Sequence, residues 1–232
     1  MRRLTTENLD EGLQLATEEA HPDVVATLFD AGARATSAKD RLAGRQPQMP
    51  GIIRQFFDHG LDPNASTSDA AFYRTLPSAR EFLVRGADPN RCSPRPPSPL
   101  AIGGSPLARA IATVRGEDVS RIELLLAYGA KLDSHLLFRA IAPRVRQKEF
   151  TIKFLLAKCL DPNVTDKTWG TPLHRAIDLG LPNIIKVLLD TGADRPAGTR
   201  YHDESPLQMA ERSQHPKKQA MLDLLRSQQA YD

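Results

Sequence analysis

The sequence has few of the residues that mark disulfide-bonded or metal-bound proteins. Its 232 residues include only two cysteines, Cys92 and Cys159, and neither belongs to a CxxC motif or accompanies paired histidines. Neither a disulfide framework nor a zinc site is therefore indicated. Such sparse cysteine is typical of a reducing compartment. We expect an intracellular, cytoplasmic location, with the nucleus also open.

Long hydrophobic runs are missing as well. The richest apolar stretch, residues 122–127, is far shorter than the roughly 20 residues that a membrane span needs. The N-terminal Met1-Arg2-Arg3 is followed by acidic residues and not by the apolar core of a secretory signal peptide. We therefore expect neither a membrane span nor secretion.

The chain also lacks a strong net charge and has few aromatic residues. Lysine and arginine number 31 against 28 aspartates and glutamates, which gives a formal charge of +3, and aromatic residues make up 6%. We expect no nucleic-acid partner, because such a partner needs a strong basic surface and stacking side chains. With 41% hydrophobic and 25% charged residues, the composition is that of a soluble folded protein.

What the sequence does have is internal repetition. One phrase consists of two apolar residues, two variable residues, glycine, alanine or leucine, and then Asp-Pro-Asn, and it occurs in full at 56–64 and 82–90. Weaker copies of this phrase occur at 28–33, 125–133, 155–163 and 188–194. A second phrase, Ser/Thr-Pro-Leu-x-x-Ala, occurs at 105–110, 171–176 and 205–210, with a weakened copy at 137–140. The alanines that end the second phrase are about 30 to 36 residues apart.

The segment from Asp166 to Asp194 resembles the ankyrin-repeat consensus, in which Thr-Pro-Leu-His-x-Ala begins the first helix and Gly-Ala-Asp follows the second. The spacing of the second phrase brackets the roughly 33-residue ankyrin period. The resemblance is tight between about Gly104 and Ala210 and extends loosely over nearly the whole chain. It implies an all-α ankyrin-repeat solenoid of about seven helix-turn-helix units with short finger loops.

Capping and glycine signals predict where the helices begin and end. Thr171 is placed to N-cap a helix that begins at Pro172, and a left-handed glycine is expected to close each second helix. Cys159 occupies one of these glycine positions, so we expect either strain there or a different helix end. The predicted helix pairs are 8–19 and 23–30, 37–43 and 51–59, 69–76 and 78–85, 106–114 and 118–128, 135–142 and 147–157, 172–179 and 182–190, and 206–213 and 216–229.

We interpret residues 1–232 as a single ankyrin-repeat domain whose parts differ in regularity. The parts are a degenerate N-terminal region 1–48, irregular repeats 49–90, a proline-rich inserted finger 91–104, well-marked repeats 105–196 and a capping repeat 197–232. The insertion makes its finger about ten residues too long. It is open to three interpretations: a passive flexible loop, a polyproline II ligand, and a substrate for a proline-directed kinase at its Ser-Pro pairs.

No nucleophile motif, phosphate loop or metal-ligand cluster is recognisable. His174 and Asp178 are four residues apart and could share a helix face, an arrangement that would suit general acid–base catalysis. The resemblance implies instead that His174 hydrogen-bonds locally and ties neighbouring turns together. We therefore predict no catalytic residue, no metal and no cofactor. The alternative is a small enzyme with a ligand pocket in the concave groove, which would take a small-molecule substrate.

The finger loops are better candidates for function, because their tips have no duty in the stack. Trp169 is the only tryptophan and lies near Lys167, a combination typical of an interface anchor. Packing of Trp169 against the next finger is the alternative. We predict a non-enzymatic module that binds a protein of unknown identity through Asp166, Lys167, Thr168, Trp169, Arg200, Tyr201, His202 and Arg95.

A basic run, Arg144, Arg146 and Lys148, occupies the turn that joins two helices of one repeat. In the ankyrin arrangement that edge lies away from the fingers. It would form a second surface for acidic partners or anionic lipid head groups, with a solvated helix face as the alternative.

Overall fold

The computed structural model describes residues 5–37, 42, 50–64, 75–91, 105–143, 145–195 and 204–227. Over these residues the chain contains twelve α-helices and one short 3-10 helix. The described residues form no β-strand, and their only β-type pairing is an isolated bridge between Asp166 and Gly170. The predicted all-α architecture of successive helix pairs is confirmed. The chain divides into two compact units, Met1–Ala110 with Val119–Lys131 and Ile111–Asp118 with Leu132–Asp232.

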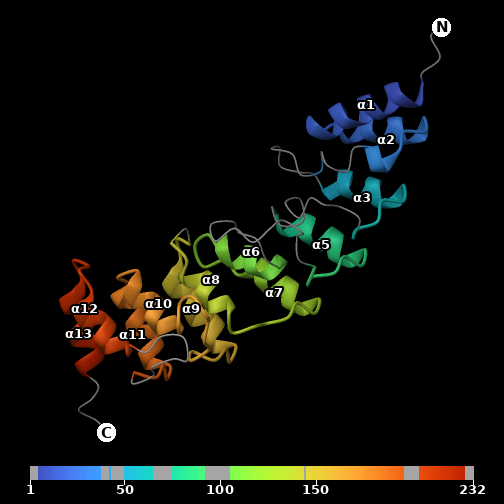
Figure 1. Ribbon diagram of the computed structural model, residues 1–232. Coiled ribbons are helices and arrows are strands. Elements are labelled where there is room, and N and C mark those ends of the chain that lie inside the picture. The colour runs from blue at the N-terminus through green and yellow to red at the C-terminus, as the bar shows by residue number, and fades with distance from the viewer. Residues whose placement is uncertain are drawn as a thin grey trace. The chain divides into compact units, whose positions relative to one another are not determined.

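In the first unit the second helices of successive repeats pack on one another. Helix α2 contacts α3, α3 contacts α5, and α5 contacts α7 (Figure 1). Aromatic rings join two of these steps, since Phe29 meets Phe56 and Phe57 meets Phe82 edge to face, each with ring centroids 5.0 Å apart. The elements of this unit are α1 (Thr6–Glu18), α2 (Pro22–Asp30), η1 (Ala35–Ser37), α3 (Pro50–Asp58), α5 (Leu76–Val84) and α7 (Ser120–Ala127).

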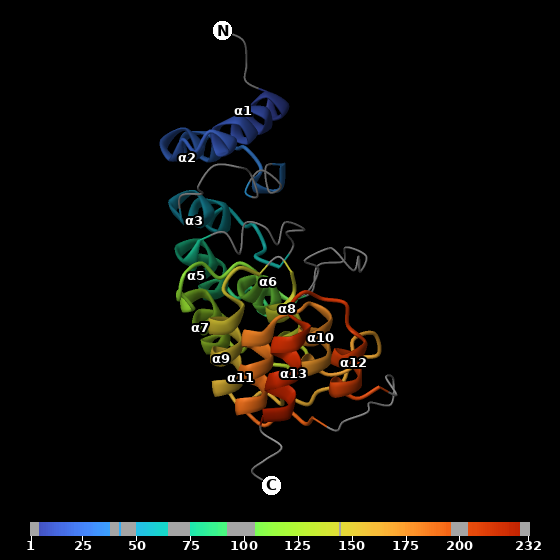
Figure 2. The ribbon, with the colours of Figure 1, turned by 90° about the vertical axis from the view of Figure 1, so that its left-hand side faces the viewer.

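In the second unit both helices of each repeat are described. The first helices α8, α10 and α12 form one row and the second helices α9, α11 and α13 form another (Figures 1 and 2). The helices are α8 (Leu136–Ile141), α9 (Lys148–Ala157), α10 (Pro172–Asp178), α11 (Pro182–Asp190), α12 (Pro206–Arg212) and α13 (Lys218–Ser227). Helix α6 (Pro106–Ala112) begins in the first unit and ends in the second.

Most predicted helix ends agree with the structure within the one or two residues by which such ends are commonly defined. The predicted boundary between 69–76 and 78–85 is wrong, because one helix, α5, already begins at Leu76. The Thr75 side chain accepts a hydrogen bond from Ser78 N–H, and Pro77 occupies the first turn, where proline is tolerated. Residues 69–74 lie outside the described residues, as does most of 37–43.

The capping signals are confirmed at the helix starts. The Thr171 hydroxyl accepts from His174 N–H at the start of α10, with Pro172 at the first helical position. Ser205 caps α12 in the same way by accepting from Gln208 N–H, and Ser205 N–H donates to the Gln208 side-chain oxygen at 2.8 Å. These residues therefore set where α10 and α12 begin.

The left-handed positions after the second helices are confirmed too. The glycines at these positions have φ between +84° and +99°, and they are Gly32, Gly60, Gly86, Gly129 and Gly192. Cys159, at the same place after α9, has φ of +62°. Of the two expectations for this cysteine, strain is therefore the correct one, because a side-chain-bearing residue there costs about 1 kcal/mol or more.

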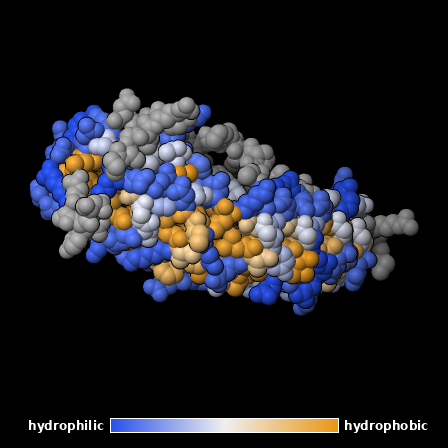
Figure 3. Space-filling model, turned by 90° about the horizontal axis from the view of Figure 1, so that it is seen from below, coloured by the Kyte–Doolittle hydropathy of each residue, from blue (hydrophilic) through white to orange (hydrophobic). Residues whose placement is uncertain are grey.

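The core of the second unit lies between the two rows of helices. Leu173 and Ala176, predicted as core, are fully buried, and so are Ile185 and Leu188 on α11. The large apolar side chains that are exposed, among the described residues, all belong to the first unit: Leu15, Val24, Val84 and Tyr128. Figure 3 shows apolar side chains reaching the surface between hydrophilic ones on one face. In the described part of the chain, the helices are too short or too polar to cross a membrane.

Candidate functional site

The predicted finger around Trp169 is a tight hairpin in the second unit. Asp166 N–H donates to the Gly170 carbonyl at 2.7 Å, and Gly170 N–H donates to the Asp166 carbonyl at 3.0 Å. The Asp166 carboxylate accepts from Thr168 N–H at 2.8 Å and from Trp169 N–H at 3.2 Å. Asp166 therefore shapes the turn, while Lys167 and Thr168 are exposed at its tip. The finger is ordered before any partner arrives.

The Trp169 side chain is half-buried and held from two sides. Its ring centroid lies 5.9 Å from that of Phe138 on α8, and the guanidinium carbon of Arg175 on α10 lies 4.7 Å from it. Arg175 is fixed in turn by an ion pair with Asp178 at 2.6 Å. The competing prediction, packing against the next finger, falls on residues 196–203, which lie outside the described residues. Trp169 contacts the preceding repeat through Phe138.

His135 extends this row of rings towards solvent. Its ring centroid is 6.2 Å from that of Phe138, and its Nδ1 is 2.9 Å from the Asp133 carboxylate. Hydrogen bonds from the His135 backbone and side chain hold the pKa of Asp133 below its ordinary value. We call His135, Phe138, Trp169 and Arg175 the aromatic row; it runs across two consecutive repeats.

Three members of the aromatic row were missed by the sequence reasoning. Phe138 occupies the position of the consensus histidine, since Leu137-Phe138-Arg139-Ala140 aligns with Leu173-His174-Arg175-Ala176. Arg175 fills the variable position of the motif. A bulky apolar residue in place of a buried polar one was the available signal for Phe138; nothing local pointed to Arg175.

His174 has the structural role that the resemblance implied. It is buried, and its Nδ1 accepts from Thr171 N–H at 3.2 Å, which leaves the proton on Nε2 to be donated to the Glu204 carbonyl at 3.1 Å. This tautomer follows from the hydrogen-bond network. Asp178 pairs with Arg175 and not with His174. The geometry does not form a catalytic pair.

The Asp-Pro-Asn phrases connect each repeat to the next. In all three the asparagine Nδ2 donates to the carbonyl of the glycine that closes the second helix of the following repeat, at 2.9 to 3.1 Å, in the pairs Asn64–Gly86, Asn90–Gly129 and Asn163–Gly192. The same asparagines accept through Oδ1 a backbone N–H two residues beyond that glycine. We call this pair of hydrogen bonds the asparagine clasp. The clasp gives the recurring Asp-Pro-Asn phrase a structural role.

The remaining predicted contact residues lie outside the described residues. They are Arg95, Arg200, Tyr201 and His202. In the described part of the chain, His, Cys, Asp and Glu side chains form no group of three or more that could hold a metal ion.

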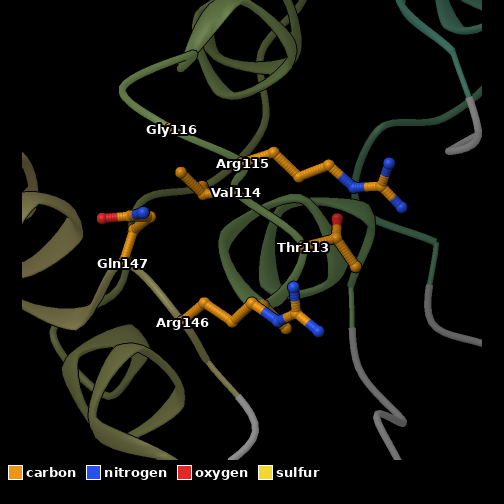
Figure 4. A pocket seen from close by; sticks show the side chains of 7 residues that line it. Thr113, Val114, Arg115, Gly116, Arg146 and Gln147 are labelled. Atoms are coloured by element: carbon orange, nitrogen blue, oxygen red, sulfur yellow. The ribbon is translucent and has the colours of Figure 1, made fainter.

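A pocket of about 570 Å³ lies elsewhere in the second unit, between the turn after α6 and the turn before α9. Its lining is Ala112, Thr113, Val114, Arg115, Gly116, Arg146 and Gln147 (Figure 4). Of the predicted basic run, Arg146 lines this pocket and Arg144 lies outside the described residues. Lys148 does not present its charge freely, because its ammonium donates to the Pro143 and Val145 carbonyls, and burial lowers its pKa.

Comparison with known proteins places these features in a fold. Residues 170–199 match the family model described as ankyrin repeat. The crystal structure of the human ASB11 ankyrin repeat domain is similar with a TM-score of 0.64 and 19% identity, over 91% of this chain and 96% of that one. An ankyrin repeat domain from Acinetobacter baumannii AYE is similar with a TM-score of 0.55 and 21% identity, over 78% and 98%. No curated protein matches the sequence.

Proposed function

The chain has the ankyrin-repeat fold and carries an ankyrin repeat at residues 170–199, and from this premise we propose that it is a non-enzymatic module that binds a protein partner through its finger loops and concave face. Ankyrin repeats are a general protein-interaction module, although a fold alone does not fix a function. The cytoplasmic location belongs to the same proposal and rests on the low cysteine content.

The observation that carries the proposal is that contacts within the protein already hold Trp169 in place. Its ring is half-buried against Phe138 and Arg175, and its backbone is held by the Asp166 carboxylate. An aromatic anchor that is already ordered loses little conformational entropy when a partner binds, so more of the contact energy appears as affinity. The exposed Lys167 and Thr168 beside it supply polar groups for the rim of an interface.

The remaining proposed contacts come from other loops. Arg200, Tyr201 and His202 belong to the next finger and Arg95 to the long proline-rich one. The proposed surface thus includes aromatic and cationic side chains. It suits a partner that presents an apolar side chain near acidic groups.

The alternative of an enzyme finds no support in the described pocket. Its lining side chains are those of alanine, threonine, valine, arginine and glutamine. General acid–base chemistry near neutral pH needs a group that exchanges a proton there, such as histidine or a carboxylate with a raised pKa. The described lining supplies none, so we do not propose catalysis.

Affinity capture followed by mass spectrometry tests the binding proposal. We expect replacement of Trp169 and Tyr201 by alanine together to reduce partner capture at least about tenfold, as loss of a central aromatic anchor does. Tyr128→Ala is the matched control, because Tyr128 is an exposed aromatic side chain at the end of α7 and is not part of the proposed surface. It should capture the partner like the unaltered chain.

Two further readouts make the result specific. Trp169 is the only tryptophan, so its fluorescence emission should shift to shorter wavelength when a captured partner covers it. Circular dichroism should show that the double variant keeps its helical content. Undiminished capture by a folded Trp169→Ala, Tyr201→Ala variant would remove this finger from the interface.

A further inference from the structure

The pocket of Figure 4 is built from two inter-helix turns of consecutive repeats. One wall is residues 112–116 at the end of α6, and the other is Arg146 and Gln147 just before α9. The Trp169 finger precedes the first helix of its repeat, whereas these turns follow first helices. The pocket therefore belongs to a different edge from the proposed finger surface, and an inference about it goes beyond the proposed function.

Charge is the feature that distinguishes this pocket. Among the described residues that line it, the charged ones are Arg115 and Arg146, and both are exposed. In Figure 4 their side chains extend towards the same side, with Thr113 between them. Glu117 and Asp118 follow in the same turn but do not line the pocket.

The two arginines also lack the partners that other basic residues of this unit have. Lys153, Arg175 and Arg212 each form an ion pair with a carboxylate, those of Glu149, Asp178 and Glu204 respectively. Within the described residues, neither Arg115 nor Arg146 has an ion pair or a side-chain hydrogen bond. Two unpaired guanidinium groups at one cavity repel each other. An anion that enters the cavity relieves this repulsion and is attracted by both charges.

We propose that this pocket binds a phosphate group carried on a serine or threonine side chain of a partner protein. A guanidinium group presents two parallel N–H donors that fit phosphate oxygens, and the two charges of Arg115 and Arg146 balance a phosphate dianion. The Gln147 amide lines the same space and adds a neutral donor.

Pocket geometry favours a phosphorylated side chain over a membrane surface. The volume of about 570 Å³ holds one phosphorylated residue with part of its neighbours. Lipid head groups instead present a plane of charge, which is met by several cations on an open face. Of the other two cations of the run, Lys148 donates to backbone carbonyls, and Arg144 lies outside the described residues.

Titration of the full chain with fluorescein-labelled peptides tests the proposal. The probe is a mixture in which phosphoserine is flanked by random residues, and the reference is the same mixture with serine. We expect fluorescence anisotropy to show binding of the phosphorylated mixture alone, with affinity that falls as salt rises. In ¹⁵N spectra the Gly116 and Thr113 amide signals should shift.

The variants Arg115→Gln and Arg146→Gln should each weaken peptide binding about tenfold or more, the effect of one lost charge-assisted hydrogen-bond pair. Arginine-to-lysine changes should weaken it less, because charge remains while the paired donors are lost. Lys186→Gln, an exposed charge loss on α11 outside the pocket, is the control and should change affinity less than twofold. Both arginines are exposed, so the variants should fold normally.

Three outcomes would overturn the proposal. One is equal affinity for the phosphorylated and unphosphorylated mixtures. Another is unchanged affinity in both glutamine variants. The third is Arg146-dependent sedimentation with phosphatidylserine vesicles but no binding of the peptides, which would assign the surface to membranes.

Discussion

Two neighbouring repeats of the second unit use the same positions for different purposes. The His174 repeat, residues 166–194, carries the Thr-Pro-Leu-His-x-Ala and Gly-Ala-Asp phrases in full, whereas the Phe138 repeat, residues 134–163, departs from them at several points. Position four of the first-helix phrase is His174 in one and Phe138 in the other. The residue that closes the second helix is Gly192 in one and Cys159 in the other.

Position four shows most clearly what the difference does. His174 reaches the carbonyl of Glu204, the residue directly before the cap of the following repeat, and Phe138 reaches Trp169, two residues before the cap of its own following repeat. The same direction of side chain therefore ties two turns together in one repeat and supports an aromatic finger in the other. Phe138, which departs from the consensus histidine, therefore supports Trp169 in the candidate site.

The clasp differs as well. Asn163 makes both hydrogen bonds of the asparagine clasp to the His174 repeat. The corresponding residue before the Phe138 repeat is Asp133, which accepts locally from His135 N–H, and the Ser134 hydroxyl accepts the N–H of Asp161 at 2.9 Å. A carboxylate cannot donate to the Cys159 carbonyl as an asparagine amide would. The joint at Cys159 thus combines a weaker clasp with a strained residue.

The largest expected effect tests what the two repeats share. Leu173 and Leu137 are fully buried at equivalent positions. Replacing either by alanine should lower the free energy of unfolding by about 2–5 kcal/mol, because each change leaves a cavity in the core. Urea unfolding followed by circular dichroism measures the loss. A change below about 0.5 kcal/mol at Leu173 would contradict the register assigned to the first helices.

A smaller effect should follow from exchanging the residues that differ at position four. His174→Phe leaves Thr171 N–H and the Glu204 carbonyl without partners in a buried place. Each such group costs about 1–3 kcal/mol, part of which the apolar ring regains by burial, so we expect a net loss of about 1–3 kcal/mol.

The reverse exchange, Phe138→His, removes the apolar support of Trp169. The most direct measurement is quenching of Trp169 fluorescence by acrylamide, because the tryptophan ring should become more accessible to the quencher. Unaltered quenching in Phe138→His would show that Phe138 does not position the finger.

The sequence was sufficient for the helix pairs, their caps and the left-handed helix ends, because each depends on local chemistry that a short phrase contains. Thr171, Pro172 and Gly192 are such residues. The aromatic row could not be predicted in the same way, since Phe138 and Trp169 are separated by a helix, a turn and another helix. Their contact depends on how consecutive repeats stack, which no local pattern specifies.

The smallest effect concerns the ends of the two second helices. Cys159→Gly should raise the free energy of unfolding by about 0.5–1 kcal/mol, because relief of the left-handed strain at φ +62° exceeds the added entropy of the unfolded chain. Gly192→Ala should lower it by about 1 kcal/mol for the opposite reason, and a β-carbon there would meet no atom within 4 Å, so only the backbone conformation is penalised. Cys159→Ala keeps the β-carbon and should change nothing, which separates strain from loss of the thiol. Unfolding in urea under reducing conditions measures all three. Equal stability of the glycine and alanine variants at position 159 would show that the Phe138 repeat carries no strain at its helix end.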